Sequence, residues 1–268
     1  MIERSIPWNE WISAREDPEL ASEKPEALDD LLVLDLSHAH YGAFLTATYL
    51  AELGAEVVKV EPPGGDPARS WGPPDVSANG DGLAFVAEAR NRYHVTLSLE
   101  AEEGRALLRG LAARADVLIE GFAPGYLDSL GIGYRQLSEL NPGLIYVACS
   151  THGQFGPRAP DHSVEYDLID QALSGLLYIT GDPDEVPVRV GSWISAYSQA
   201  AWGAVAALAA LHWRESSGLG QMIDISGAEA IMRYLEFTVL FSNGLNIDDG
   251  GSYETPAQYV GKRVEIKF

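Results

Sequence analysis

Apolar residues in the first half of the chain alternate between two kinds of segment. The run "LLVLDLS" (31–37) is apolar and of strand length, and "GAFLTATYLAELG" (42–54) has apolar residues at helical spacing up to a terminal glycine. A further run, "EVVKVEPP" (56–63), ends at two prolines. This strand, helix and strand predict a parallel crossover of the usual right hand.

The same alternation continues to residue 150. We expect further strands at 94–99, 116–122 and 144–150, and helices at 102–115, 126–132 and 134–141. Apolar strands separated by amphipathic helices indicate a parallel sheet that is covered on both faces. The predicted fold class is therefore α/β, a Rossmann-like doubly wound parallel sheet. Its ligand should lie at the carboxyl ends of the strands, near the topological switch point.

The pattern after residue 151 predicts helices at 167–178, 198–215 and 228–241 and a strand at 221–226. The most apolar stretch, 200–211, is rich in alanine and too short to span a bilayer, so we interpret it as a buried helix. The helix at 228–241 has apolar residues nearly all round, and we expect another chain to bury it.

This pattern also suggests a division of the chain. Residues 1–29 form a polar and acidic extension, and 30–244 form the Rossmann-like large domain. Residues 245–268 are rich in turns and form either the start of a small domain, otherwise largely missing, or a linker. The first residues have scattered charges and no apolar core of a secretory signal.

Charge and cysteine content narrow the class of function. A net charge of -21 on 268 residues repels nucleic acid and anionic membrane surfaces, so neither is an expected partner. Cys149 is the only cysteine, which excludes an intrachain disulfide and suits a reducing cytoplasm. We therefore expect a soluble cytoplasmic protein.

Polar residues that could hold a ligand follow the first three strands. His38 and His40 lie in a loop that either faces a ligand or caps a helix. The next loop suits the gripping of a nucleotide, although a solvated turn has the same composition; it carries Glu61, Asp66 and Arg69. A local basic cluster, which either binds phosphate or forms salt bridges, comprises Arg90, Asn91 and Arg92.

Taken together, several segments resemble the class III CoA-transferase family, which includes formyl-CoA transferase, the carnitine CoA-transferases and α-methylacyl-CoA racemase. The resemblance is carried by "LDLSHAHYGAF", "LAELGAEVVKVEPPGGDPAR", "ADVLIEGFAPGYLDSLGIGYRQLSELNPGLIYVACSTHGQFGP", "EYDLIDQALSGLLYITG" and "SGLGQMIDIS". It implies a large and a small domain, interlocked dimers, and acyl-CoA and a small carboxylic acid as substrates. It implies no metal.

By position, the resemblance also implies which residues contact CoA. These candidates are His40, Tyr41, Pro62, Leu97 to Glu100, Gly121, Phe122 and Ala123. Pro62 stands where formyl-CoA transferase has an arginine, and Glu100 stands where the family commonly has lysine. Both departures bear on the affinity for CoA.

Transferases that this chain resembles use a nucleophilic Asp, which attacks the thioester and later leaves again. The residue at that position here is Ala196, and no Asp or Glu occurs between Glu185 and Glu215. Asp167 matches a second family position, at which the racemase uses an Asp as acid and base. Tyr166 replaces the racemase histidine beside it, and Asp167 is equally well explained as a helix N-cap.

The resemblance leads to three hypotheses. The first is a subunit of a heteromeric CoA-transferase that lacks the nucleophile, as in benzylsuccinate-type enzymes, and that pairs with a related chain. The second is an acyl-CoA racemase or isomerase with Asp167 as the catalytic residue. The third is a structural or CoA-binding partner without catalysis. Family members continue through a small domain, and this sequence ends where that domain should begin.

Overall fold

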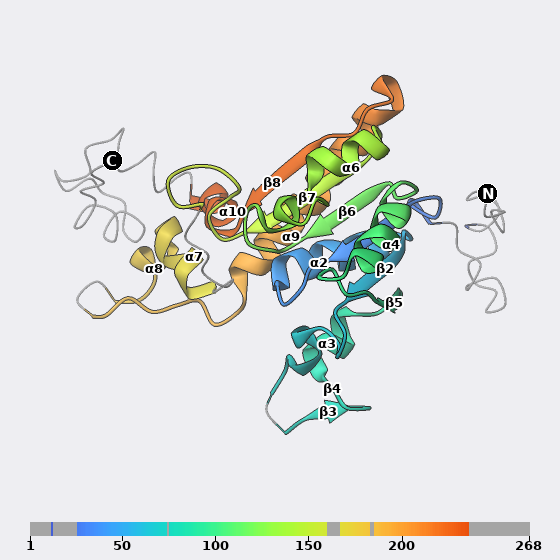
Figure 1. The fold of residues 1–268 in the computed structure, drawn as a ribbon. Coiled ribbons are helices and arrows are strands. Elements are labelled where there is room, and N and C mark those ends of the chain that lie inside the picture. Colours follow the sequence, from blue (N-terminus) through green and yellow to red (C-terminus); the bar gives the residue numbers. More distant parts are fainter. Residues whose placement is uncertain (1–11, 13–25, 74, 160–166, 183–184, 236–268) are drawn as a thin grey trace.

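A six-stranded parallel sheet forms the centre of the computed structural model, which describes residues 12, 26–73, 75–159, 167–182 and 185–235 (Figure 1). The order across the sheet is β5-β2-β1-β6-β7-β8. The strands are β1 (Leu32–Leu36), β2 (Glu56–Glu61), β5 (Arg92–Thr96), β6 (Val117–Glu120), β7 (Ile145–Ser150) and β8 (Met222–Ser226). This order has the Rossmann arrangement, with the switch point between β1 and β6. The predicted fold class is confirmed.

Helices cover the two faces of the sheet (Figure 1). On one face, α2 (Tyr41–Glu52) and α9 (Ile194–Ser217) pack alanine and leucine side chains against the strands. On the other face, α4 (Glu102–Ala112) and α6 (Tyr134–Leu140) bury leucines against the sheet. The shorter elements are η2 (Pro67–Ser70), β3 (Ser77–Ala78), β4 (Asp81–Gly82), α3 (Leu83–Glu88), α5 (Tyr126–Ser129), α7 (Asp167–Ser174), α8 (Leu176–Ile179), α10 (Gly227–Met232) and η3 (Arg233–Leu235).

The position of α9 is unusual for this topology. It lies on the same face as α2, although β8 extends the sheet in the direction opposite to β2. The crossover that contains α2 and the crossover that contains α9 therefore have opposite hands, whereas nearly all such connections are right-handed. The consequence is that α9 packs along α2, close to the loop that follows β1.

Among the described residues, α9 is the one helix that is long and apolar enough to cross a membrane by length and composition, and half of its most apolar part is buried. It is longer than the predicted 198–215 because it begins at Ile194. Its alanines at 204, 207 and 210 are in the core cluster with α2, so we interpret it as a core helix of this sheet.

Several predicted boundaries were wrong. The strand expected at 94–99 runs from Arg92 to Thr96, because Arg92 is itself a core residue. The helix expected at 167–178 is divided into α7 and α8 by Gly175, whose φ of 87° ends α7. The last predicted helix begins one residue early, at 227, and its part beyond 235 lies outside the described residues, as do 245–268 and most of 1–29.

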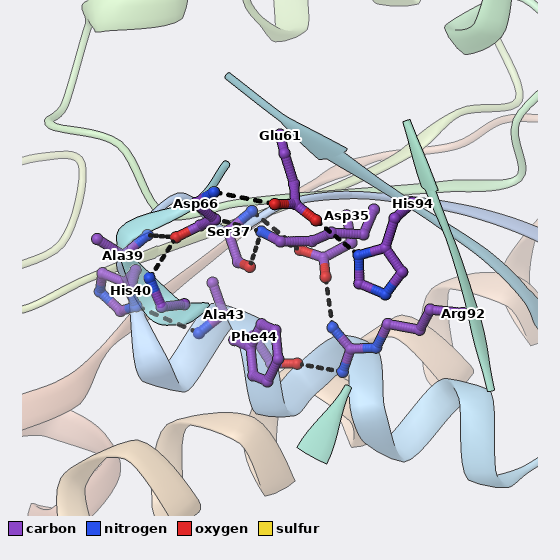
Figure 2. Close-up of polar contacts among 12 residues, drawn as sticks. Asp35, Ser37, Ala39, His40, Ala43, Phe44, Glu61, Asp66, Arg92 and His94 are labelled. Atoms are coloured by element: carbon purple, nitrogen blue, oxygen red, sulfur yellow. Dashed lines mark hydrogen bonds and ion pairs between the residues drawn. The ribbon is translucent and has the colours of Figure 1, made fainter. Parts of the chain in front are cut away.

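A buried charge cluster joins β2 to the loops at the carboxyl end of the sheet (Figure 2). The Lys59 side chain is fully buried, and its Nζ lies 2.8 Å from Asp66 Oδ2 and 3.7 Å from Asp35 Oδ1. It also donates a hydrogen bond of 2.9 Å to Ser37 Oγ. Burial alone would raise the pKa of Asp66, but Lys59 and the N–H groups of Ala68 and Ala39 hold it below its usual range.

We predict that Lys59→Met lowers the free energy of unfolding by about 3–5 kcal/mol, because Asp66 would keep a buried charge with no cation. Methionine retains most of the lysine volume, so the loss reports on the charge rather than on a cavity. Urea unfolding of the purified chain at pH 7 measures it. Arg135→Met, at an exposed position on α6, is the control and should change the free energy by less than about 0.5 kcal/mol. Equal effects of the two substitutions would contradict the prediction.

Candidate functional site

The loops that follow β1 and β6 meet at the switch point. The His38 ring stacks on Phe122 with 5.5 Å between centroids, and Phe122 stacks on Tyr126 at 5.0 Å. A Cβ atom at Gly121 would lie 2.3 Å from the Cβ atom of His40, so only glycine allows the two loops this close. The result is a row of three aromatic rings along one side of the carboxyl end of the sheet.

A cavity of about 220 Å³ lies beside these rings. Its lining residues are Leu36, His38, Val60, Glu61, Pro62, Pro63, Leu97, Ser98, Leu99, Glu100, Phe122 and Tyr126. The structure thus brings together six of the predicted CoA-contacting residues, namely Pro62, Leu97, Ser98, Leu99, Glu100 and Phe122. Gly121 lies at the loop contact, and Ala123 lines a different, larger cavity of about 620 Å³. The CoA contacts themselves stay predictions.

Arg69 is held by acidic side chains beside the cavity. Its Nε and Nη2 each donate to the Glu61 carboxylate at 2.7 Å, and its Nη1 donates to Asp81 at 2.9 Å. Glu61 also lies 2.6 Å from His94 Nδ1 (Figure 2). Burial would raise the pKa of Glu61, but the hydrogen bonds from Arg69, the backbone of Asp66 and His94 lower it to about 2. Arg69 therefore fixes the loop after β2 rather than offering a free fork to a phosphate.

Arg92 lies in the core, away from any ligand surface. Its side chain is fully buried, is paired with Asp35, and donates to the carbonyl of Phe44 at 2.8 Å (Figure 2). Its guanidinium also lies 4.2 Å from the centroid of the Phe44 ring. The salt-bridge alternative for the basic cluster is therefore the one that the structure shows for Arg92. Asn91 is exposed just before β5, with a φ of 58°, and takes no part in the cavity.

His40 and Tyr41 begin α2 and face inward. The Nδ1 atom of His40 accepts the N–H of Ala43 at 3.2 Å, so this side chain caps the helix. Burial lowers its pKa to about 4, so His40 is neutral at physiological pH. The Tyr41 ring makes edge contacts with Trp71 and Trp193, with centroids 5.0 Å and 5.5 Å apart. Both side chains therefore pack at the start of α2, directly after the loop that follows β1.

Ala196 lies in the first turn of α9 and is fully buried in a cluster with Tyr41 and Phe44. The N–H of the preceding residue, Ser195, donates to Asp167 Oδ1 at 2.8 Å. Asp167 is buried, and its other oxygen accepts from Gln171 and lies 3.7 Å from Arg189. Asp167 thus caps the start of α9, whereas the sequence predicted a cap for the helix that Asp167 itself begins. It lies beside the position at which a nucleophile is expected.

Glu120 is a buried acid that the sequence interpretation missed. It ends β6, is only 4% exposed, and its carboxyl accepts the N–H of Phe122 at 2.7 Å. Burial raises its pKa to about 8 against this hydrogen bond, and the charges of Asp128 and Asp224 act in the same direction. The only sequence signal was a glutamate inside the otherwise apolar run 117–122. Through this hydrogen bond, the Glu120 carboxyl fixes the backbone at Phe122.

In the described part of the chain, no cluster of His, Cys, Asp and Glu side chains could hold a metal ion. The acids of this region instead bond to arginine, lysine and backbone N–H groups. The arrangement is that of a binding site, with an aromatic cavity at the switch point and the start of α9 close to the same loop.

Comparison with known proteins identifies a family that this chain matches. The family model described as CoA-transferase family III matches residues 28–257. Succinyl-CoA–D-citramalate CoA-transferase of Chloroflexus aurantiacus is 41% identical over 217 residues, which cover 79% of this chain and 52% of that relative. From the same species, the α subunit of succinyl-CoA–L-malate CoA-transferase is 40% identical over 78% of this chain and 48% of its own length. The β subunit is 41% identical over 70% of this chain and 46% of its own length.

A solved structure has the same fold. A CAIB/BAIF family protein from Brucella suis is 34% identical, with a TM-score of 0.76, over 82% of this chain and 58% of that one. The chain thus spans about half the length of the curated relatives that it matches. The substrates and partners of those relatives belong to longer chains.

We predict that Glu120→Gln stabilises the fold increasingly as the pH rises. The pKa of Glu120 is about 8 in the folded chain and near 4.5 in the unfolded chain. Its contribution to the free energy of unfolding is therefore fully present below pH 4.5 and is lost as the pH rises towards 8. Glutamine does not titrate and can still accept the Phe122 N–H. Relative to the wild type, the free energy of unfolding of the variant should rise by on the order of a few kcal/mol between pH 5 and pH 8.

Urea unfolding at both pH values measures this gain. Glu139→Gln, at an exposed position on α6, is the matched control, and its pH dependence should follow that of the wild type. Parallel pH profiles for Glu120→Gln and the wild type would show that Glu120 is ionised in the folded chain, against the prediction.

Proposed function

The chain belongs to CoA-transferase family III, and we propose that it is a subunit of a heteromeric CoA-transferase that moves CoA between two carboxylic acids. In this proposal it supplies the large-domain frame, and a related chain supplies the nucleophilic carboxylate. The observation that carries the proposal is Ala196, whose methyl group occupies the first turn of α9 beside Asp167.

A carboxylate is required because of the course of the transfer. It attacks the thioester carbonyl, the C–S bond breaks, and CoA leaves as a thiolate, so that the enzyme carboxylate and the donor acyl group form a mixed anhydride. The thiolate then attacks the enzyme carbonyl and releases the donor acid. The acceptor carboxylate then attacks the aspartyl-CoA thioester and displaces the thiolate. The thiolate attacks the acceptor carbonyl of this second anhydride and releases the enzyme carboxylate. A methyl group at position 196 can perform none of them.

Asp167 is a poor substitute for that nucleophile. Both of its oxygens are engaged, one by the Ser195 N–H and one by Gln171, and the side chain is 3% exposed. We assign it a positioning role at the start of α9. The same engagement disfavours the racemase hypothesis, in which Asp167 would exchange a proton with substrate.

The names of the relatives support a partner of related sequence. Both the α and the β subunits of succinyl-CoA–L-malate CoA-transferase are similar to this chain, which indicates that heteromers in this family can be built from homologous chains. Acyl-CoA and a small carboxylic acid are the proposed substrates. The cytoplasm is the proposed compartment, because a chain with one cysteine, Cys149, forms no intrachain disulfide and suits a reducing environment.

We predict that the complex purified from its native source forms an acyl-enzyme on the partner chain and none on this chain. The complex is incubated with acyl-CoA and trapped with hydroxylamine, and peptide mass spectrometry locates the aspartyl hydroxamate. A hydroxamate on Asp167 would overturn the proposal and make this chain the catalytic one. Absence of any hydroxamate or transfer activity would favour a purely structural or CoA-binding partner.

We also predict that Ala196→Asp gives this chain a trappable carboxylate within the same complex. The first turn of a helix favours a negative charge, which offsets part of the cost of burying an aspartate beside Tyr41 and Phe44. Hydroxamate should then appear at position 196. Tyr197→Asp places an exposed carboxylate one residue further along α9 and should give none. Equal labelling of both variants would show that position 196 has no special access to the thioester.

A further inference from the structure

The larger cavity, of about 620 Å³, is separate from the aromatic cavity at the switch point. The loop after β6 divides them, because Phe122 and Tyr126 line the smaller cavity whereas residues 123–125 line the larger one, and the two share no lining residue. The other walls of the larger cavity come from β6, α5, α6, β7, β8 and the loop after β7. Its volume lies within the roughly 300–1,000 Å³ of pockets that enclose small ligands.

Two buried polar groups in the wall of this larger cavity lack a partner within the described part of the chain. Glu120 is only 4% exposed, and its Oε2 atom accepts the Phe122 N–H at 2.7 Å, but no described group donates to its Oε1 atom. The Nε2 atom of Gln154 is likewise buried without a hydrogen bond to the described residues. Buried polar atoms in proteins are nearly always hydrogen-bonded. This wall is therefore suited to a polar ligand rather than to an apolar one.

The charges near this wall are mostly negative. Asp128 is exposed and lines the same cavity, and Asp224 accepts the backbone N–H of Gln154 at 2.8 Å. Burial raises the pKa of Glu120 to about 8, and the charges of these two aspartates add to that rise. Arg135 is the only cation among the described residues that line the cavity, and it is exposed on α6. The buried end of the cavity thus lacks a positive charge that would let Glu120 ionise.

Aromatic rings and apolar side chains form much of the remaining wall. Tyr134 and Tyr146 make an edge contact with their ring centroids 5.7 Å apart. Phe155, Leu127 and Met222 also line the cavity. The face of an aromatic ring attracts an ammonium group, and apolar side chains suit the hydrocarbon part of an amine. This combination favours an organic ammonium ion over an inorganic cation.

We propose that the larger cavity binds a small organic molecule with a primary ammonium group. The ammonium donates to Glu120 Oε1 and to the Asp128 carboxylate, and the hydrocarbon part of the ligand lies against the rings of Tyr134 and Tyr146. On binding, Glu120 releases its proton to solvent, because an adjacent cation favours the carboxylate. Its hydrogen bond from the Phe122 N–H then becomes charge-assisted and stronger. This site goes beyond the proposed transfer of CoA and does not depend on it.

Three probes of similar size test this site with the full chain. Ligand-observed NMR titration at low salt compares phenethylamine with 2-phenylethanol, which has the same ring and chain length but no charge, and with 3-phenylpropanoate, which is an anion. We expect phenethylamine to bind about tenfold more tightly than 2-phenylethanol at pH 8, because it adds a charge-assisted hydrogen bond. The anion should bind most weakly of the three.

The same titration at pH 6 and pH 8 tests the part played by Glu120. Phenethylamine stays protonated over this range, whereas a carboxyl with a pKa of about 8 is almost entirely neutral at pH 6. The affinity for phenethylamine should therefore rise about tenfold from pH 6 to pH 8. The other titratable groups that face Glu120 are Asp128, Asp224 and Tyr146. Burial raises the pKa of Tyr146 well above its ordinary value, so this phenol stays neutral throughout.

Variants locate the effect. Glu120→Gln should lower the affinity for phenethylamine at pH 8 about tenfold and abolish its rise with pH. Asp128→Asn should lower the affinity at both pH values and keep the rise, and Asp224→Asn should also keep it. Glu139→Gln removes a charge from an exposed position on α6 that does not line the cavity, and should change neither the affinity nor the rise. Circular dichroism of each variant checks that it is folded.

Three outcomes would overturn the inference: equal or weaker binding of phenethylamine compared with 2-phenylethanol, the same pH dependence in Glu120→Gln as in the wild type, or no binding of any probe. A Glu120→Gln variant that fails to fold leaves the decision to Asp128→Asn, whose unchanged affinity would also contradict the site. None of these results bears on the transfer of CoA, which the hydroxamate assay tests separately.

Discussion

The ion pair between Lys59 and Asp66 is the interaction on which the geometry of the site depends. It joins β2 to the loop that follows it, and the same Asp66 accepts the N–H of Ala39 in the loop after β1. A buried pair of this kind gives little net stability compared with apolar packing, but loss of one partner is costly. Its effect is therefore to allow one arrangement of the two loops, the one that leaves the cavity open beside Pro62.

A second constraint brings α9 to the same place. Because α9 shares a face with α2, its first turn lies near Tyr41, which begins α2. Asp167 fixes that turn by accepting the Ser195 N–H, which no residue within α9 can accept. The unusual hand of this crossover thus sets the position of residue 196: a connection on the other face would place it across the sheet from the loop after β1.

The sheet was predictable from the sequence because its strands are continuous apolar runs whose burial needs no particular partner. The polar contacts in the core were not predictable from the sequence. Arg92 was assigned either to phosphate binding or to a salt bridge, but its partner Asp35 lies 57 residues earlier, and nothing local to either residue indicates the pair. Asp167 was predicted to be either an acid and base or the N-cap of its own helix, but the N–H group that it caps lies 28 residues later. Glu120 and the elements η2 to α3 were missed for the same reason, since they are defined by distant contacts rather than by periodicity.

Alanine suits the fold at position 196, at which the family resemblance implies a nucleophilic acid. Alanine has the highest helix propensity, and a small apolar side chain packs against Tyr41 and Phe44 without a buried charge. The negative charge that favours the start of a helix is already provided by Asp167, from outside α9. The fold therefore does not depend on an acid at position 196. A chain whose partner performs the chemistry can lose that acid and still keep the Lys59 cluster, the aromatic rings and the capped start of α9.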